Sequence, residues 1–233
     1  MTKKIKLITF DLDDTLWDNM PTITRAEIDT RKWIEDRVGK IEWGSFEDFL
    51  HLREELILED ESIKWDISKL RKEIFRRKIN HVEPEKFKND LVNNAFNIFI
   101  KKRHEVILFD GVETAIKELS KKYQLGILTN GNADIFKFDI GKYFNFSISC
   151  LEAKDSKPNR SHFDKAKEIT KINFNEMLHI GDHQINDIFG AFNLGIETLW
   201  FNNNNEKWNQ NFAKPLEFSD WNNLVPILRN NYE

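Results

Sequence analysis

The hydrophobic and polar positions of this chain follow two different rhythms. Short apolar runs of strand length occur near the N-terminus and again in the second half, and the stretch between them repeats its apolar residues at helical spacing. The first run, residues 5–10, is rich in isoleucine, leucine and phenylalanine and stops at Asp11. Its length and composition predict a buried parallel strand with Asp11 at its carboxyl end. In open α/β sheets, ligands bind at this edge.

The middle of the chain, residues 17–103, contains no convincing strand pattern. Instead, apolar residues recur three and four positions apart in four separate segments, which predicts four amphipathic helices. These segments lie at residues 23–34, 46–57, 70–75 and 87–99. We therefore expect an inserted all-helical domain over residues 17–103.

Beyond this insertion, strand-like and helix-like segments alternate, which predicts a parallel sheet with helices on both faces. The fold class is therefore α/β, with a Rossmann-like core formed by residues 1–16 and 104–233. Residues 216–228 carry a further apolar pattern that predicts a short terminal helix. The expected strands lie near residues 106–109, 125–129, 146–151, 177–180 and 197–201, and the expected helices near 112–119, 161–170 and from 186 onward.

Composition and charge narrow the range of partners. The chain has 233 residues, enough for one domain with an insertion or for two small domains, and a net charge of -4. Basic residues are interleaved with acidic ones, so no continuous positive surface for a nucleic acid polymer is expected. No apolar run reaches signal-peptide or membrane-spanning length, which favours a cytoplasmic protein without a membrane partner. The single cysteine, Cys150, lies in an apolar strand-like segment and is expected in the core.

Carboxylates gather directly after the first predicted strand. Asp11 and Asp13 are separated by one residue, so in an extended chain both point the same way and repel each other. A cation must neutralise them, and a hard divalent ion such as Mg²⁺ prefers oxygen ligands. An acidic surface loop after an edge strand is the alternative interpretation. The residues near the ends of the other predicted strands distinguish a metal site from such a surface loop.

Three later segments near strand ends carry complementary groups. Thr129 and Asn130 open a glycine-containing turn whose hydroxyl and backbone N–H groups can hold phosphate oxygens, although such turns also occur as ordinary helix caps. Lys157 supplies a cation before a proline, although surface lysines are common in this chain. Asp182 follows an apolar strand, and Asp187 follows five residues later, where a helix N-terminus also favours a carboxylate.

Together these motifs resemble the phosphatase branch of the haloacid dehalogenase superfamily. The first motif of that family, Asp-x-Asp-x-Thr after a strand, is matched by Asp11, Asp13 and Thr15. A strand ending in threonine, a lysine before a proline and Gly-Asp-x-x-x-x-Asp match the other three motifs in the same order, and the insertion lies where the family places a helical cap. The segments around Asp11, Thr129 and Asp182 look most like bacterial flavin mononucleotide phosphatases and related nucleotidases.

The resemblance implies a Mg²⁺-dependent phosphatase that hydrolyses a small phosphorylated metabolite through an aspartyl-phosphate intermediate. It assigns Asp11 as the nucleophile. It assigns Asp13 as the acid that protonates the leaving group and as the base that then activates water. Mg²⁺ is assigned to the carboxylates of Asp11 and Asp182 and to the backbone carbonyl of Asp13.

The same resemblance assigns phosphate binding to Thr129, the backbone N–H of Asn130, and Lys157, which also stabilises the nucleophile. Asp187 and Thr15 are expected behind the groups that touch the metal. For Asp187, this means acting through a water or orienting Lys157.

Two further residues are candidates for contact with the substrate. Trp17 stands next to the first motif, and its aromatic ring is of a kind that stacks on a flavin or nucleobase. His183, beside Asp182, is expected to line the pocket.

Three other functions remain open on the sequence alone. A haloacid dehalogenase shares the nucleophile but needs neither a general acid nor Mg²⁺, so Asp13 and Asp182 argue against it. A phosphomutase keeps the Asp-x-Asp pair and differs in how its cap excludes water. A non-catalytic phosphate-binding or partner-docking protein on this fold would be expected to lack a motif residue, yet all of them are present.

Overall fold

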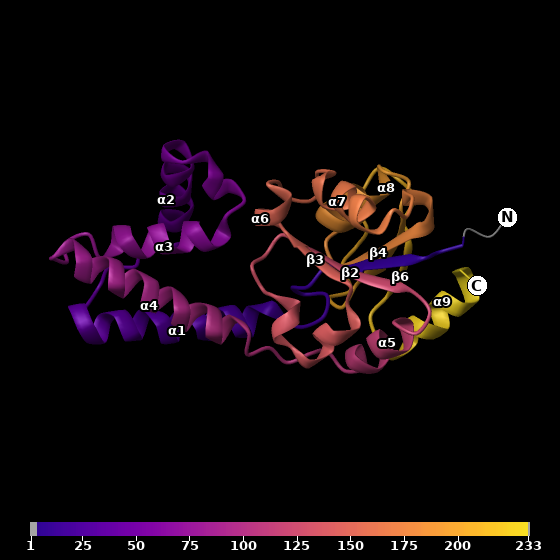
Figure 1. Cartoon of the computed structure of the whole chain (residues 1–233), viewed down its shortest axis with the longest axis horizontal. Helices are drawn as coiled ribbons and strands as arrows, with labels where there is room; N and C mark the ends of the chain where they lie inside the picture. Colours follow the sequence, from indigo (N-terminus) through magenta and orange to yellow (C-terminus); the bar gives the residue numbers. More distant parts are fainter. Residues whose placement is uncertain (1–3, 233) are drawn as a thin grey trace. The chain divides into compact units, whose positions relative to one another are not determined.

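The computed structural model describes residues 4–232 of the chain. Contacts between Cα atoms divide the chain into two compact units (Figure 1), one formed by Met1–Asp18 and Ile107–Glu233 and the other by Asn19–Val106. The first unit is an α/β unit, and all the regular structure of the second is helical. The helical unit therefore spans residues 19–106, where the sequence pattern placed the insertion at 17–103.

A six-stranded parallel sheet forms the centre of the α/β unit and confirms the predicted fold class. Its strands lie in the order β3-β2-β1-β4-β5-β6. Because β1 lies between β2 and β4, all four of its residues are buried. The strands are β1 (Leu7–Phe10), β2 (Gln124–Thr129), β3 (Phe146–Ser149), β4 (Met177–Gly181), β5 (Glu197–Phe201) and β6 (Leu216–Phe218).

Helices cover both faces of this sheet (Figure 1). On one face, Phe163 of α7 and Ala191 of α8 join the same buried cluster as Leu7 of β1. On the other face, where α5 and α9 lie, Phe10 of β1 packs against Trp221 with ring centroids 6.0 Å apart. The helices are α5 (Val112–Leu119), α6 (Cys150–Ala153), α7 (Ser161–Thr170), α8 (Gly190–Phe192) and α9 (Leu224–Tyr232). Shorter helical turns are η2 (Ile135–Lys137), η3 (Asp139–Tyr143), η4 (Phe174–Glu176), η5 (Gln184–Phe189) and η6 (Trp221–Asn223).

Two sequence-based expectations about elements of this unit were wrong. Residues 106–109 form no strand, and only Leu108 makes an isolated antiparallel bridge, to Trp17. The reason is that this segment lies outside the sheet, where its backbone pairs with Leu16 and Trp17 of the loop after β1 instead of with a strand. The apolar run 216–228 is not one helix, because its first three residues pair with β5 as β6 and the helix begins at Leu224.

The helical unit contains the four helices that the periodicity predicts. They are α1 (Asn19–Val38), α2 (Phe46–Glu59), α3 (Ile67–Lys78) and α4 (Glu85–Arg103), with a short turn η1 (Glu61–Lys64). Ser45 begins α2 through a capping box with Asp48, which satisfies backbone N–H groups at the helix start. Ile34 of α1, Phe75 of α3 and Leu91 of α4 belong to one buried cluster. Within residues 4–232, no helix has the length and hydropathy needed to cross a membrane.

The arrangement of the sheet determines where its polar loops meet. The central strand β1 pairs with β2 and with β4 in parallel, so Phe10 lies opposite Ile127 and Ile180. The loops that follow these three strands therefore leave the sheet side by side at one edge. Each of them begins with residues that the sequence marked as chemically important.

Candidate active site

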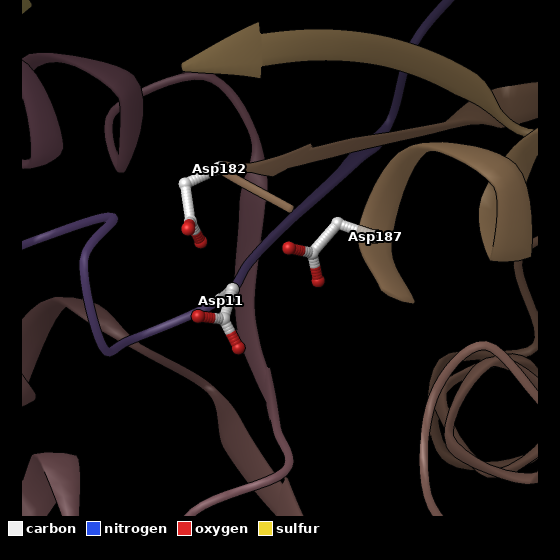
Figure 2. Close-up of side chains that lie close together, drawn as sticks. All are labelled: Asp11, Asp182 and Asp187. Atoms are coloured by element: carbon white, nitrogen blue, oxygen red, sulfur yellow. The ribbon is translucent and has the colours of Figure 1, made fainter. Parts of the chain in front are cut away.

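Three carboxylates converge at the carboxyl edge of the sheet. Asp11 follows β1, and Asp182 and Asp187 follow β4. One oxygen from each of these side chains lies within 4.8 Å of the others, and Figure 2 shows the three groups pointing toward one another. Asp11 and Asp187 are buried. Like charges packed this closely away from water require a compensating cation.

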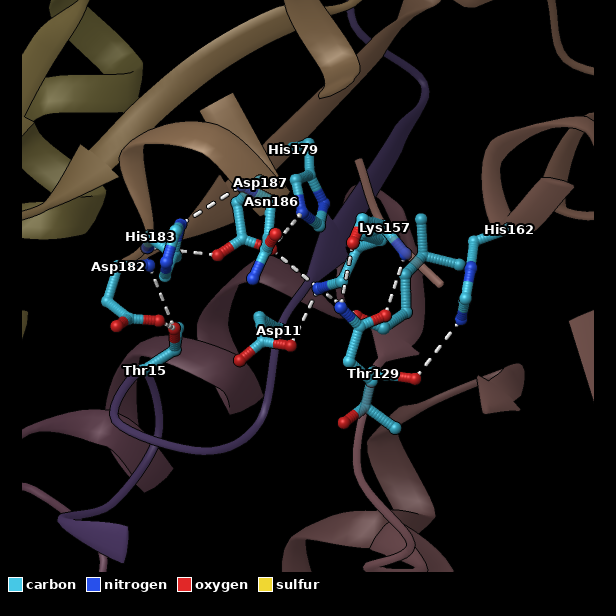
Figure 3. A network of polar contacts seen from close by, with 12 residues as sticks. Asp11, Thr15, Thr129, Lys157, His162, His179, Asp182, His183, Asn186 and Asp187 are labelled. Atoms are coloured by element: carbon cyan, nitrogen blue, oxygen red, sulfur yellow. Dashed lines mark hydrogen bonds and ion pairs between the residues drawn. The ribbon is translucent and has the colours of Figure 1, made fainter. Parts of the chain in front are cut away.

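Lys157 supplies one positive charge to this cluster. Its ammonium donates to Asp11 Oδ1 at 2.7 Å, to Asp187 Oδ1 at 2.5 Å and to the carbonyl of Leu128 at 2.5 Å (Figure 3). Three acceptors match the three hydrogens of an ammonium group. Since Lys157 is only 2% exposed, its side chain is fixed between the ends of β1 and β2 and the residues after β4.

Lys157 and Asp187 are held in their charged forms by each other. Burial alone would lower the pKa of Lys157, but the facing carboxylates of Asp11 and Asp187 outweigh burial and raise it. Burial also tends to raise the pKa of Asp187, but the ammonium of Lys157 holds that pKa well below its usual value. Removing either partner would leave a buried charge without compensation, which is strongly destabilising.

The charges of the other two carboxylates, Asp11 and Asp182, are not fully compensated by Lys157. Burial raises the pKa of Asp11 well above its ordinary value; Lys157 opposes this shift, and the neighbouring aspartates add to it. Burial also raises the pKa of Asp182 to about 7, and repulsion from Asp187 and Asp14 adds to this. One lysine therefore does not balance the cluster.

The donor set fits a hard divalent cation. In the part of the chain that the structure describes, the group of side chains suited to hold a metal is Asp11, Asp182 and Asp187, and all its donors are carboxylate oxygens. Oxygen ligands are what Mg²⁺ prefers. Of the three, Asp187 has the most other partners, because it also accepts from Lys157, from His179 and from the backbone N–H of His183. Asp11 and Asp182 are thus better suited to direct metal binding than Asp187.

Thr15 fixes the orientation of Asp182. The Thr15 hydroxyl donates to Asp182 Oδ1 at 3.1 Å and accepts from the Asp182 backbone N–H at 3.1 Å. This reciprocal pair joins the loop after β1 to the loop after β4. Thr15 is fully buried and does not line the cavity described below.

Asp13 is held by the neighbouring tryptophan. The indole Nε1 of Trp17 donates to Asp13 Oδ1 at 3.0 Å, and Asp14 between them adopts the left-handed conformation, with φ of 60°. This turn reverses the chain directly after the catalytic motif. The carboxylate of Asp13 therefore has a defined direction although it is only partly buried.

The position of Trp17 corrects the expectation that its ring contacts a substrate. Its side chain is fully buried, and it packs against Phe138 with ring centroids 5.2 Å apart. An enclosed ring offers no face for stacking on a ligand. In this structure Trp17 orients Asp13 instead.

The turn after β2 is held by contacts that the sequence did not reveal. The backbone N–H of Gly131 donates to the Thr129 hydroxyl at 2.9 Å. The side chain of Asn130 accepts from the Lys157 backbone N–H at 2.8 Å and donates to the Lys157 carbonyl at 3.0 Å. Asn130 thus links the predicted phosphate turn to the lysine loop through its side chain, in addition to the predicted role of its backbone N–H.

Three histidines, of which His162 and His179 are buried and His183 is exposed, complete this framework (Figure 3). His162, in the first turn of α7, donates through Nε2 to the carbonyl of Thr129 at 3.1 Å. His183 accepts through Nδ1 from the backbone N–H groups that begin η5, at 3.1 Å each. His179 lies within β4 behind Asp187. The one signal in the sequence for His162 and His179 was a polar residue within an otherwise apolar pattern.

The predicted residues surround a small cavity of about 150 Å³. A cavity of this size exceeds the share of a single water, about 30 Å³, but is smaller than sites for whole drug-sized ligands, about 300–1,000 Å³. It therefore suits the reacting group of a ligand. Among the predicted site residues, those that line it are Asp11, Asp13, Thr129, Asn130, Lys157, Asp182, His183 and Asp187.

Cys150 lies next to this site but outside its chemistry. It is buried, and its Sγ contacts the backbone carbonyl of Asn130 at 3.4 Å. Burial raises the pKa of the Cys150 thiol to about 11, so the thiol stays protonated at neutral pH. This agrees with the core position expected from the sequence.

Comparison with known proteins places the chain among hydrolases of one family. The family model described as haloacid dehalogenase-like hydrolase matches residues 5–195. The 5-amino-6-(5-phospho-D-ribitylamino)uracil phosphatase of Escherichia coli is 27% identical over 230 residues, which cover 97% of each chain. The glyceraldehyde 3-phosphate phosphatase of Pyrococcus abyssi is 29% identical over 212 residues, covering 84% of this chain and 81% of that one.

A solved structure extends the likeness to the whole fold. The 2-haloacid dehalogenase of Pseudomonas syringae superposes with a TM-score of 0.90 and 31% identity, covering 97% of this chain and 99% of that one. Likeness at this level covers both units of the chain. The loops described above thus belong to a fold shared with a named dehalogenase, in a chain that is similar in sequence to named phosphatases.

The buried imidazole of His162 makes stability depend on pH. Burial, with Lys157 adding, lowers the pKa of His162 to about 4, whereas an unfolded histidine titrates near about 6.5. Between these values the unfolded state binds the proton first, so stability falls as pH falls from about 6.5 to 4. Between pH 7 and 5 we expect this group to cost about 2 kcal/mol of unfolding free energy, a loss that His162→Gln avoids.

Urea unfolding of wild type and His162→Gln at pH 7 and pH 5 measures this difference. His81→Gln, at an exposed position of the helical unit, is the matched control and should keep the wild-type pH dependence. Equal losses in wild type and His162→Gln between the two pH values would contradict the assignment.

The carboxylate cluster predicts stabilisation by Mg²⁺. A ligand at 100 times its dissociation constant adds about 2.7 kcal/mol, and each kcal/mol raises the Tm of a chain of this size by about 2–4 °C. Asp182→Asn keeps an oxygen that can accept from Thr15 but removes one of the crowded charges. We expect this variant to be at least as stable as wild type without metal and to lose most of the Mg²⁺-induced rise in Tm.

Thermal unfolding with EDTA and with Mg²⁺ tests this expectation. Asp164→Asn, at a site where the aspartate pairs with Arg160 on α7, is the control and should retain the full rise. A full rise in Asp182→Asn would place the metal elsewhere.

Proposed function

The chain belongs to the haloacid dehalogenase-like hydrolase family, and from this premise we propose that it is a Mg²⁺-dependent phosphatase that hydrolyses a small phosphomonoester through an aspartyl-phosphate intermediate. One observation carries the proposal: the buried carboxylate of Asp11, bonded to Lys157 at 2.7 Å, lies beside two further carboxylates at the mouth of a cavity. A nucleophile, its counter-charge and a cation site occur there together.

Asp11 is the proposed nucleophile. One of its carboxylate oxygens attacks the phosphorus, a bond forms between them, and the bond from phosphorus to the ester oxygen breaks. The ammonium of Lys157 keeps Asp11 directed at one position and offsets charge on the transferring group. Because Lys157 is buried, its charge is little screened by solvent.

Asp13 is the proposed acid and base. It gives its proton to the ester oxygen as that oxygen leaves as an alcohol. It then takes a proton from the water that attacks the phosphorus of the intermediate, which releases phosphate and restores Asp11. The hydrogen bond from Trp17 Nε1 to Asp13 Oδ1 supports this role, because it holds the carboxyl group in one orientation and an acid must face the atom that it protonates.

The turn after β2 is the proposed cradle for the phosphoryl oxygens. The hydroxyl of Thr129 and the backbone N–H of Asn130 stand at the cavity beside Lys157. The contacts of Asn130 and His162 fix this turn before any substrate arrives, and preorganised donors are those that favour the transition state.

Asp11 and Asp182 are the proposed ligands of Mg²⁺, with the backbone carbonyl of Asp13 as a third. When bound, the ion neutralises the carboxylates and the phosphate that must approach them. Thr15 serves this site by holding Asp182, and Asp187 serves it by holding Lys157.

The likeness to a named 2-haloacid dehalogenase makes that reaction the main alternative. A halide leaves without a proton and without a metal, so that reaction gives Asp13 no function and no reason for Asp182 to face Asp11. A phosphomutase uses the same first step but returns the phosphoryl group to its substrate. A non-catalytic binding protein has no need of a nucleophile paired with a lysine in a cavity.

The relatives point to a class of ester. The E. coli protein is named for a 5-phospho-ribityl compound, and the P. abyssi protein for glyceraldehyde 3-phosphate. Each phosphate stands on a primary alcohol at the end of a hydroxylated carbon chain. We propose this class for the present chain, with phosphorylated ribityl compounds such as flavin mononucleotide and its precursors as first candidates. Alkoxides leave poorly, so such an ester needs the acid that Asp13 supplies.

A panel of phosphorylated metabolites tests the proposed reaction. The panel contains flavin mononucleotide, its ribityl precursor, glyceraldehyde 3-phosphate, sugar phosphates and a nitrophenyl phosphate, and inorganic phosphate is measured with Mg²⁺ or EDTA. We expect Mg²⁺-dependent release by wild type, and less than about one per cent of that rate with Asp11→Asn, because the amide is no nucleophile.

Two further readouts of this panel separate the alternatives. Chloride release from a 2-chlorinated acid without metal would support the dehalogenase, and an isomerised sugar phosphate without free phosphate would support the mutase. Asp11→Asn that stays folded by circular dichroism and retains substantial turnover would overturn the nucleophile assignment.

The Asp13→Asn substitution should slow the hydrolysis of esters with poor leaving groups more than that of esters with good leaving groups. With an alkyl phosphate, whose alcohol must be protonated, we expect the rate to fall by about 10²- to 10⁴-fold. With a nitrophenyl phosphate, whose anion leaves without help, the first step should be affected far less. Pre-steady-state release of nitrophenol measures that step, and normal hydrolysis of glycerol phosphate by the variant would contradict the acid role.

A further inference from the structure

A chain of buried polar side chains runs through the sheet behind the carboxylate cluster. Thr9 of β1 and His179 of β4 are paired in register, and each is at most 1% exposed. The Thr9 hydroxyl lies 2.9 Å from His179 Nδ1, and His179 Nε2 lies 3.3 Å from Asp187 Oδ1. Figure 3 shows His179 directed at Asp187, on the side away from the nucleophile. The proposed reaction gives His179 no task.

The partners of His179 determine which ring nitrogen carries its proton. A carboxylate only accepts, so Nε2 must donate to Asp187. Burial lowers the pKa of His179 and favours the neutral ring, which leaves Nδ1 as an acceptor for the Thr9 hydroxyl. Asp187 and burial thus set the tautomer in which His179 faces Asp187 with a hydrogen. The Thr9 hydroxyl has two acceptors within reach, His179 Nδ1 at 2.9 Å and the Leu178 carbonyl at 3.4 Å, and Nδ1 is the nearer.

Asp187 is itself held by three donors. Its Oδ1 accepts from Lys157 and from His179, and its Oδ2 accepts from the His183 backbone N–H at 3.0 Å. Two of these donors fix the carboxylate from behind, so it can present Oδ1 to the lysine. Gly181 leaves the space this requires, because a Cβ there would lie 2.4 Å from the Asp187 carboxyl carbon.

We propose that His179 is a positioning residue of the catalytic site: it holds the Asp187 carboxylate so that Lys157 stays directed at Asp11. The proposal rests on the proposed function, since a displaced Lys157 matters for turnover only if Asp11 is the nucleophile. Partners of this kind, behind the groups that act directly, typically change activity about 10- to 100-fold when removed.

A packing role alone is a weaker account of His179. Its ring meets Phe163 edge-on at 5.2 Å, so it does fill space in the core. An apolar ring of similar size would fill the same space without bringing polar atoms into a fully buried strand. Burying an imidazole is costly unless both nitrogens are satisfied, and here Thr9 and Asp187 satisfy both.

Two substitutions separate positioning from packing. His179→Phe keeps a ring but removes the donor, whereas His179→Gln places an amide N–H within similar reach of Asp187. We expect kcat with a nitrophenyl phosphate to fall at least tenfold in His179→Phe and to recover to within about threefold of wild type in His179→Gln. Phe163→Leu is the matched control: it loosens the packing on the imidazole, keeps the donor, and should leave kcat within about twofold of wild type.

A second measurement follows Lys157 without turnover. The ammonium groups of lysines give ¹⁵N–¹H signals, and through-bond correlations from the assigned Lys157 backbone identify the signal of its ammonium. In wild type and His179→Gln, the triply bonded ammonium should exchange slowly with water; in His179→Phe its signal should shift or broaden. Long-range ¹⁵N coupling should show the Nε2–H tautomer of His179 in wild type.

The outcomes distinguish this proposal from the proposed function. Wild type without phosphatase activity would overturn the function, and the lysine signal would still test the positioning. Active wild type with unchanged kcat and an unchanged Lys157 signal in His179→Phe would overturn the positioning role alone. So would His179→Gln falling as far as His179→Phe when both are folded by circular dichroism, because the retained donor would then have no effect.

Discussion

The site depends on one buried ion pair, between Lys157 and Asp11. Two charges removed from water are costly, and their attraction offsets this only when the geometry is good and further hydrogen bonds satisfy both groups. Here the ammonium has three acceptors that come from three parts of the chain. Each of these parts must therefore be in place before the pair is stable. The same pair fixes the direction of the nucleophile, so the condition for folding is also a condition for the proposed chemistry.

The order of the strands in the sheet brings the three acceptors of Lys157 together. With β1 between β2 and β4, loops separated by more than a hundred residues in sequence begin next to one another. The helical unit interrupts the chain directly after the first of these loops, yet the α/β unit remains continuous. The ends of the interruption are joined by the bridge between Trp17 and Leu108 and by the hydrogen bond from the Phe109 N–H to the Leu16 carbonyl. Trp17, which forms this bridge, also donates a hydrogen bond to Asp13. The same tryptophan therefore joins the two ends of the α/β unit and orients the carboxylate of the proposed acid.

The sequence predicted those parts of the site that follow from the pattern of residues within a short segment. An apolar run that stops at a carboxylate marks a strand end, and the rule that parallel strands end at one edge predicts that Asp11 and Asp182 lie together. Lys157 follows no strand directly, and the family resemblance predicted its place beside them. Contacts of Asn130, His162 and His179 were not predicted, because each joins residues distant in sequence and each residue type is also compatible with a turn or a core. The strand expected at 106–109 failed for a related reason: a strand needs an open partner, and pairing is not visible in a run of apolar residues. The ring of Trp17 was expected to contact a ligand because its neighbours in sequence belong to the proposed catalytic motif, whereas in the structure it is buried and packs against Phe138.

Charge balance connects these observations to the proposed cofactor. With all three carboxylates ionised, one ammonium would leave an excess of two negative charges in a setting with little water. A phosphomonoester is itself an anion and would be repelled by this site unless the excess were removed. Protonation of Asp11 would remove part of it but would also remove the nucleophile, whereas one divalent cation removes all of it and leaves Asp11 ionised. The pairing of Lys157 with Asp187 as well as Asp11 then has a clear consequence: the lysine charge stays beside the proposed nucleophile, and the charge of Asp182 is left for the proposed metal to compensate.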